Sequence, residues 1–307
     1  MIAALAGGVG AARFLRGLLE MCDERDVAVV VNTGDDVVLH GLRVSPDVDT
    51  VTYTLAGAVN PETGWGLAGE TWTVMEALER YRGLTWFRLG DRDLATHLYR
   101  THRLGEGATL SEVTDELAKS WGLGLRVLPM SDDRVETRLD VEGEGEVAFQ
   151  DYFVRRRHAV TVKAVRFAGA ADAHPAPGVL DTLSTASRLV ICPSNPVLSI
   201  APILAVPGIE AAVAARRDDV VAVSPIVAGA ALKGPADRLM AELGHEVSVA
   251  GVARLYSALA ATLVVDEADA ALAPAVEEAG MRCVVAPAVM HGVAEAAALA
   301  EVVLGCS

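Results

Sequence analysis

The first thirty residues switch from one hydrophobic pattern to another. Residues 1–6 form an apolar run that is too short for anything but a strand, and three glycines follow it within four residues. From Ala11 to about Met21 the apolar side chains return at helical spacing, at Phe14, Leu15, Leu18 and Leu19. This pattern predicts a strand, a glycine turn and a helix.

Further apolar runs predict a parallel sheet buried on both faces, because strands covered by helices on each side need no polar alternation. One run follows the first helix, at Val27–Val31. Others begin near residue 159, with helical stretches between most of them: Val160–Phe167, Leu189–Cys192, Val220–Val223, Leu263–Val265 and Cys283–Ala286. We therefore expect an α/β fold: a Rossmann-like parallel sheet core with helices on both faces, formed by residues 1–60 and 159–307.

Residues 61–158 interrupt this rhythm, and we expect them to form a mainly helical insertion carrying a β-hairpin. A helix is expected just before the insertion, from Thr50 to Ala58, and three within it, the last capped by Ser111: Thr71–Tyr81, Asp93–Arg103 and Ser111–Trp121. Alternating residues predict the hairpin, at Val135–Leu139 and Glu146–Phe153. Tryptophans also gather in this segment, at Trp65, Trp72 and Trp86. Such residues are more often core, but beside an acid-rich loop they could hold a flat heteroaromatic ring.

Composition excludes several classes of partner. The sequence has 26 Lys and Arg against 41 Asp and Glu, a formal net charge of −15, which argues against nucleic acid and against an anionic membrane surface. Its four cysteines show no C-x-x-C spacing, so neither a disulfide framework nor a zinc site is expected. The chain starts inside a predicted strand without a basic leader, and no stretch is long enough to span a membrane. We expect a soluble, cytoplasmic protein.

The glycine turn formed by Gly7, Gly8, Val9 and Gly10 is a candidate phosphate site. A helix N-terminus presents free N–H groups, and glycine lets a phosphate approach the backbone closely. The turn lacks the Gly-Lys-Ser/Thr ending of a P-loop, and Arg13 stands where the dinucleotide fingerprint has its third glycine. A tight turn without a ligand is the alternative, but Arg13 favours an anion.

Four acidic residues lie close together: Asp35, Asp36, Asp47 and Asp49. Asp35 and Asp36 follow a predicted strand directly, and so belong in the crevice where open α/β sheets bind ligands. Two adjacent carboxylates suit a hydrated Mg²⁺. The alternatives are a solvated turn or, for Asp35, the ribose-binding acid of a dehydrogenase. Asp47 and Asp49 could cap the next helix, but four acids exceed what capping needs.

Polar residues also follow later strands. Ser194 and Asn195 come directly after the strand at Leu189–Cys192, and Ser224 comes after the next one. Serine and asparagine at the carboxyl end of a strand can bind a base or a ribose. Any one of these segments could be an ordinary loop. Ordinary loops explain less well why several such segments are predicted at one edge of the sheet.

Five segments together resemble the 2-phospho-L-lactate transferase family, also called CofD, or FbiA in actinobacteria. They extend in order over nearly the whole chain: Gly7–Arg13, Asn32–Asp36, His40–Thr50, Gly90–His97 and Pro193–Ser199. The segments Asp47–Thr50 and Gly90–His97 are far more specific than the glycine turn.

The resemblance implies a step of coenzyme F-420 biosynthesis. The family joins 7,8-didemethyl-8-hydroxy-5-deazariboflavin to a phospholactyl or phosphoenolpyruvyl group. The donor is a guanosine diphosphate ester, the products are GMP and F-420-0 or its dehydro form, and Mg²⁺ is required. A homodimer is the family expectation.

The resemblance also implies roles for individual residues. Asp49 and Arg88 match the acid and the base that contact the deazaflavin, and Thr50 and His40 belong to the same site. The donor's nucleotide is assigned to Gly7, Gly8, Val9, Gly10, Arg13, Ser194 and Asn195. Asp35 is the expected magnesium carboxylate, with Asp36 behind it. Asp35 and Asp49 are both candidates for the catalytic acid that takes the hydroxyl proton.

Two other functions compete with this interpretation. A related branch with the same glycine turn and Asn32–Asp36 segment consists of regulators that bind nucleotide-sugars without known turnover. They lack the aromatic insertion as it stands here, which favours the enzyme. A dehydrogenase would rest only on Gly8, Gly10 and Asp35. The sequence does not distinguish a lactyl from an enolpyruvyl donor.

Overall fold

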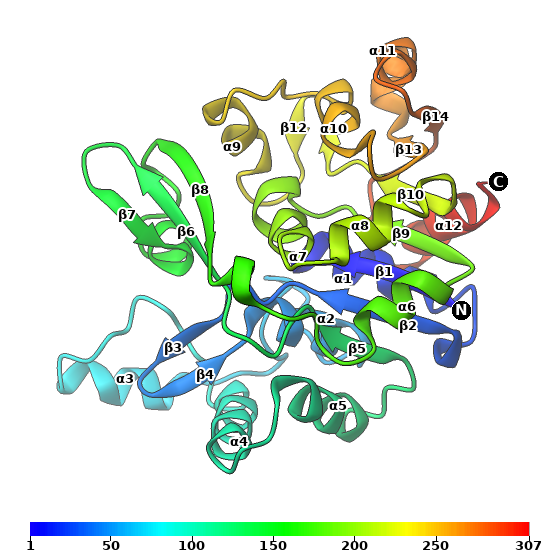
Figure 1. The fold of residues 1–307 in the computed structure, drawn as a ribbon. Coiled ribbons are helices and arrows are strands. Elements are labelled where there is room, and N and C mark those ends of the chain that lie inside the picture. Colours follow the sequence, from blue (N-terminus) through cyan, green and yellow to red (C-terminus); the bar gives the residue numbers. More distant parts are fainter. Residues whose placement is uncertain (307) are drawn as a thin grey trace.

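A seven-stranded parallel sheet forms the centre of the computed structural model, which describes residues 1–306 (Figure 1). The strand order is β14-β13-β10-β9-β1-β2-β5. The strands are β1 (Ile2–Ala6), β2 (Val27–Val31), β5 (Arg126–Pro129), β9 (Arg188–Ile191), β10 (Val220–Val223), β13 (Thr262–Val265) and β14 (Arg282–Val285). All the pairings are parallel, which confirms the predicted Rossmann-like α/β core.

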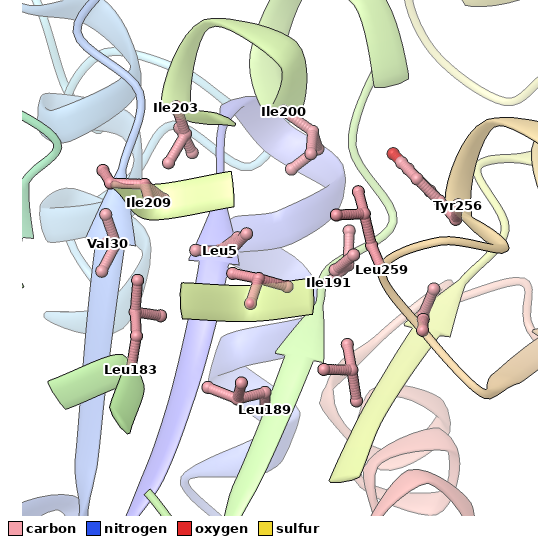
Figure 2. Packing of buried hydrophobic residues seen from close by; sticks show 14 of the residues in the cluster. Leu5, Val30, Leu183, Leu189, Ile191, Ile200, Ile203, Ile209, Tyr256 and Leu259 are labelled. Carbon is pink, nitrogen blue, oxygen red and sulfur yellow. The ribbon is translucent and has the colours of Figure 1, made fainter. Parts of the chain in front are cut away.

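Helices cover both faces of this sheet, because successive strand residues point to opposite sides. In β1, Ala3 and Leu5 enter one hydrophobic cluster, and Ala4 and Ala6 enter the other. Figure 2 shows Leu5 packed among isoleucines and leucines of the first cluster. That cluster lies under α6 (Val179–Thr185), α7 (Ala201–Leu204), α8 (Ile209–Ala214), α10 (Val249–Tyr256) and α11 (Ala273–Glu278). The second lies under α1 (Gly8–Leu18), α2 (Pro46–Leu55), α5 (Leu110–Ser120) and α12 (Val293–Gly305).

Two smaller units project to the left of the main sheet in Figure 1. One is the hairpin of β3 (Val37–Leu39) and β4 (Leu42–Val44), which packs on α3 (Thr73–Arg80), with α4 (Asp93–Gly105) beside it. The other is an antiparallel sheet of β7 (Gly145–Ala148), β6 (Glu136–Val141) and β8 (Val162–Ala168), packed on α9 (Ala236–Glu242). Two further short strands, β11 (Ile226–Val227) and β12 (Ala230–Ala231), pair antiparallel with each other. Among residues 1–306, no helix has the length and apolar character needed to cross a bilayer.

Several local predictions are corrected by these elements. The strand expected at Val160–Phe167 is β8, which pairs antiparallel with β6 instead of joining the core. Only Val162 of this strand is fully buried and the rest are half-buried or exposed, which suits a sheet with one solvated face. The expected hairpin is therefore one part of a three-stranded sheet, and Asp151–Arg155 is a helical turn. Within the predicted insertion, β5 extends the main sheet by pairing with β2.

Two helix starts also differ from the prediction. The helix expected from Thr50 begins at Pro46, because proline suits the first turn, where its missing N–H is not needed. The N-cap of α5 is Thr109 instead of Ser111. The Thr109 hydroxyl accepts a hydrogen bond from the Glu112 N–H, and the Glu112 carboxylate accepts one from the Thr109 N–H. The Ser111 hydroxyl donates instead to Asp132.

Replacing Gly17 with alanine is expected to destabilise the fold by about 1–3 kcal/mol, because overpacking shifts the backbone. A Cβ at Gly17, in α1, would lie 2.2 Å from the carbonyl carbon of Ala296, in α12. Gly305→Ala is the control, since a Cβ there meets no atom of residues 1–306 within 4 Å. Urea unfolding measures both variants. Equal stability of Gly17→Ala and wild type would contradict this close approach of α1 and α12.

Candidate functional site

A cavity of about 630 Å³ opens at the carboxyl ends of the central strands. One wall consists of segments that directly follow the strands: Gly7–Gly10 after β1, Asp35 after β2, Pro193–Asn195 after β9 and Ser224 after β10. Further lining residues come from the predicted insertion and include aromatic side chains: Trp65, Phe87, Phe149 and Phe153. Segments far apart in the sequence thus meet at one sheet edge, as open α/β folds dictate.

The N-terminus of α1 faces this cavity. Its N-cap is Gly7, which offers no capping side chain, and its first turn contains no acidic residue. The first N–H groups of a helix have no partner within the helix and carry the positive end of its dipole. This end of α1 is therefore suited to bind an anion.

The three positions of the turn require glycine for different physical reasons. A Cβ on Gly7 would lie 2.6 Å from Asp47 Oδ2, and one on Gly10 would lie 2.3 Å from the carbonyl oxygen of Pro193. These two glycines are required by packing within the protein. Gly8 has a φ of +73°, a conformation that side chains disfavour, and a Cβ there would meet only Asp47 Oδ1, at 3.6 Å.

Ser194 and Asn195 line the cavity but also shape their own loop. The Ser194 hydroxyl accepts a hydrogen bond from the Gly7 N–H at 3.3 Å, which ties the loop after β9 to the glycine turn. Asn195 Oδ1 accepts from the N–H groups of Val197 and Leu198 at 2.9 and 3.1 Å. This oxygen therefore caps the next helical turn and is not free for a ligand.

Asp35 and Asp47 form a pair of carboxylates on the cavity wall, joined by Asn32. Asn32 Nδ2 donates to Asp47 Oδ2 at 2.9 Å and to Asp35 Oδ1 at 3.4 Å. Burial, followed by the charges of Asp47 and Asp36, raises the pKa of Asp35 well above its ordinary value. Burial raises the pKa of Asp47 to about 6, although hydrogen bonds from Asn32 and the Gly8 N–H oppose the shift.

These two carboxylates fit a hard divalent cation. Neither forms an ion pair with any residue in the range 1–306, so no cationic side chain in that range offsets their repulsion. Magnesium binds through one or two carboxylates and completes its shell with water and phosphate oxygens. From the sequence, Asp47 is either a helix cap or one of a surplus of acids, and only the fold shows its contact with Asn32, fifteen residues away.

Asp36 points away from Asp35 and lines a second cavity, of about 260 Å³. Its Oδ2 accepts a hydrogen bond from the Ser45 hydroxyl at 2.7 Å. Burial raises the pKa of Asp36 to about 8. The expected magnesium pair of Asp35 and Asp36 is thus divided between two cavities, because neighbouring residues of this turn face opposite sides.

In metal-free buffer, the free energy of unfolding is expected to fall as pH rises from 3.8, the ordinary value for Asp36, toward its folded pKa of about 8. In this interval the native protein holds a proton that the unfolded chain has lost, so raising the pH favours unfolding. Asp36→Asn removes this proton. Urea midpoints near both ends of the interval should therefore differ less in the variant. An equal fall in both proteins would mean that other groups cause it.

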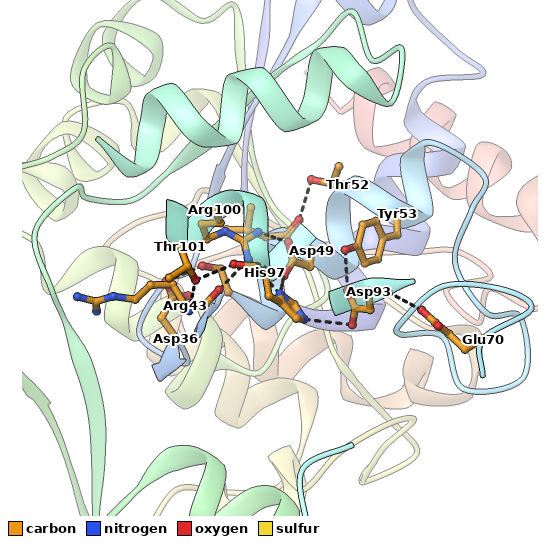
Figure 3. Close-up of polar contacts among 12 residues, drawn as sticks. Asp36, Arg43, Asp49, Thr52, Tyr53, Glu70, Asp93, His97, Arg100 and Thr101 are labelled. Carbon is orange, nitrogen blue, oxygen red and sulfur yellow. Dashed lines mark hydrogen bonds and ion pairs between the residues drawn. The ribbon is translucent and has the colours of Figure 1, made fainter. Parts of the chain in front are cut away.

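Asp49 is held by a buried network from α2 and α4 (Figure 3). Both of its carboxylate oxygens accept hydrogen bonds from the Arg100 guanidinium, one of them at 3.1 Å. His97 Nδ1 lies 3.7 Å from Asp49 Oδ2, and its Nε2 lies 3.4 Å from Asp93 Oδ2. The Tyr53 hydroxyl donates to Asp93 at 2.6 Å. Asp49 still lines the main cavity, but its charge is neutralised by Arg100.

Asp49, Asp93 and His97 could also hold a metal ion, since one ligand atom from each lies within 4.8 Å of the others. Arg100 has no exposed surface and already satisfies Asp49, so a cation here would be repelled by the guanidinium. The unpaired carboxylates of Asp35 and Asp47 suit a cation better.

The remaining residues predicted to contact the deazaflavin divide into two groups. Arg88 and Thr50 line the main cavity, and the Arg88 guanidinium lies 4.1 Å from the centre of the Trp72 ring. His40 does not line it: this exposed residue in the β3–β4 turn bonds through Nε2 to the Leu84 carbonyl at 2.8 Å. Trp86 packs in the small core beneath this hairpin.

Besides Arg88, two further cationic side chains line the cavity, Arg13 and Lys233, and of these two only Arg13 is predicted from the sequence. Arg13, on α1, forms no hydrogen bond or ion pair with any residue in the described chain. Lys233, in the loop between β12 and α9, donates to the Thr63 carbonyl at 2.9 Å. Burial, followed by the charge of Arg13, lowers the pKa of Lys233. A single lysine in a loop far from every motif gave no sequence signal.

Known families and proteins match this chain along most of its length. The model of a family described as 2-phospho-L-lactate transferase CofD matches residues 2–290. A phosphoenolpyruvate transferase of Streptomyces griseus is 50% identical over 305 residues, covering 98% of this chain and 96% of the relative. Phosphoenolpyruvate transferase of Mycobacterium tuberculosis is 42% identical over 285 residues, 86% of each chain.

Solved structures share the fold. A UPF0052 family member from Bacillus halodurans aligns with a TM-score of 0.64 over 99% of this chain and 98% of its own. Its sequence is 16% identical, so the likeness supports the architecture alone.

Proposed function

From the premise that the chain belongs to the 2-phospho-L-lactate transferase CofD family and is a transferase, we propose its substrates and products. It transfers a phosphorylated three-carbon acid group from a guanosine diphosphate ester to the ribityl hydroxyl of 7,8-didemethyl-8-hydroxy-5-deazariboflavin. The products are GMP and coenzyme F-420-0 or its dehydro form. Relatives named phosphoenolpyruvate transferase, at up to 50% identity, favour the enolpyruvyl donor.

The observation that carries this proposal is the single cavity in which three kinds of group meet. The α1 N-terminus and the free guanidinium of Arg13 suit the donor's diphosphate. Asp35 and Asp47 suit a metal, and the aromatic side chains that line the cavity suit a flat tricyclic ring. A binding protein for the donor alone would need no aromatic wall.

At the donor end, the protein's part is to hold the diphosphate and offset its charge. Helix N–H groups and Arg13 would bind the phosphate oxygens, and Asp35 and Asp47 would hold Mg²⁺. Bound there, Mg²⁺ would neutralise charge on the transferred phosphoryl group and on the leaving GMP. Phosphoryl transfer depends mainly on such positioning and charge stabilisation.

At the acceptor end, Arg88 and Thr50 would orient the deazaflavin so that its ribityl hydroxyl lies in line with the phosphorus. Asp49 would contact the same molecule while Arg100 fixes its carboxylate in one orientation. With both oxygens already accepting hydrogen bonds, Asp49 suits positioning better than removal of a proton. Asp35 has no cationic partner among residues 1–306, so it is the better candidate for the base that removes the proton from the hydroxyl.

Incubation of the pure protein with the deazaflavin, Mg²⁺ and each guanylylated donor tests the proposal. Mass spectrometry should identify the dehydro form of F-420-0, and GMP should appear in equal amount. Binding of donor without any product from either ester would favour a nucleotide-binding regulator instead.

A further inference from the structure

Arg13 and Lys233 are brought together from distant parts of the chain and remain available to an anion. The sequence places them 220 residues apart, yet both line the main cavity, where the charge of Arg13 adds to burial in lowering the pKa of Lys233. Within residues 1–306, neither pairs with a carboxylate, although acidic residues outnumber basic ones. Two neighbouring cations without a counter-ion repel each other, so an anion between them would stabilise both.

Lys233 also connects two walls of the cavity. It lies in the loop between β12 and α9, whereas its hydrogen-bond acceptor, the Thr63 carbonyl, belongs to the segment Asn60–Gly66. That segment lies directly against the start of α1: a Cβ on Gly64 would be 2.9 Å from Val9 Cγ1 and 3.0 Å from Lys233 Nζ. Because an ammonium group has three donors, Lys233 can hold Thr63 and still donate to a ligand.

We infer that Arg13 and Lys233 together clamp the diphosphate of the donor, and that the bond from Lys233 to Thr63 makes donor binding order the segment Asn60–Gly66. This inference rests on the proposed function for the identity of the donor. Trp65 and Gly66, in the same segment, line the cavity, so ordering this segment completes the wall near the acceptor. The donor therefore prepares the site for the deazaflavin.

Calorimetric titration with GDP tests the clamp, because GDP carries the diphosphate without the three-carbon acid. Lys233→Met and Arg13→Met should each weaken GDP binding about ten- to a hundredfold, as expected for a lost charge-assisted contact. Lys233→Arg should retain most of the affinity. The matched controls are Lys163→Met and Arg16→Met, which remove charges outside the cavity that are paired with Glu142 and Glu20. Both should bind GDP as wild type does.

Hydrogen exchange tests the connection to Thr63. Saturating GDP should slow amide exchange in residues 60–66 of wild type and of Lys163→Met, but not of Lys233→Met at GDP concentrations that also saturate it. A lysine with only a structural role would change exchange equally with and without GDP. That result, or unchanged GDP affinity in Lys233→Met, would overturn the inference. If wild type itself fails to bind GDP, the proposed function is what fails.

Discussion

Replacing Asp35 with asparagine is expected to lower turnover about a hundredfold or more, because the metal that we propose at Asp35 and Asp47 would lose a ligand. The substitution keeps the shape of the side chain and removes its charge. Asp47, bonded to the same Asn32 amide, would be left as the single carboxylate at this position of the cavity wall. Deazaflavin binding should change little, since its proposed contacts are Arg88, Thr50 and Asp49. Initial rates at saturating substrates measure the effect.

Two comparisons separate the charge at Asp35 from net charge. Asp140→Asn removes an exposed carboxylate on β6, outside the cavity, and should keep full activity. Asp36→Asn removes a carboxylate that lines the second cavity, and should cost less activity than Asp35→Asn. Full turnover in Asp35→Asn, or in wild type stripped of metal with EDTA, would refute the metal assignment.

The main sheet was predictable because its strands are buried on both faces. A short apolar run such as Val27–Val31 has few possible structures other than a buried strand when glycine turns and helical patterns lie on both sides of it. The run at Val160–Phe167 was misassigned, since its content of valine and alanine resembles that of a core strand. Only pairing with β6 shows that one of its faces is solvated.

The candidate site was predictable where it follows directly from the ends of strands. Gly7–Gly10, Asp35 and Ser194 face one cavity because parallel strands all end at the same sheet edge. Contacts that cross between segments were not predictable. Asp47 joins Asp35 through Asn32, and Lys233 reaches Thr63 over 170 positions.

Side chains that are close in the sequence also point in different directions, which residue type does not reveal. Asp36 is adjacent to Asp35 but faces another cavity, because successive residues of the turn point to opposite sides. His40 shares a motif with Thr50, yet it sits at the exposed tip of a hairpin. Motif membership therefore located the region of the site and not the direction of each side chain.

Asp49→Ala is expected to destabilise the fold by about 3–5 kcal/mol, because it leaves the Arg100 guanidinium buried without its counter-ion. Arg100 has no exposed surface, and Asp49 accepts two of its hydrogen bonds. The loss of deazaflavin binding expected from the resemblance would then be obscured by unfolding. Urea unfolding of the single variant measures the structural part. Asp115→Ala, which breaks an exposed pair with Lys119, should cost less than about 1 kcal/mol.

The double variant Asp49→Leu with Arg100→Met separates the two roles of Asp49. Replacing a buried ion pair by apolar side chains of similar size is often neutral or stabilising, so the double variant should unfold near the wild-type midpoint. Its cavity would still lack the carboxylate, so deazaflavin should bind more weakly, by about the 1–3 kcal/mol of a lost buried hydrogen bond. GDP affinity should be retained, because the α1 N-terminus and Arg13 are unchanged. A stable double variant that binds deazaflavin as wild type does would show that Asp49 serves only to hold Arg100.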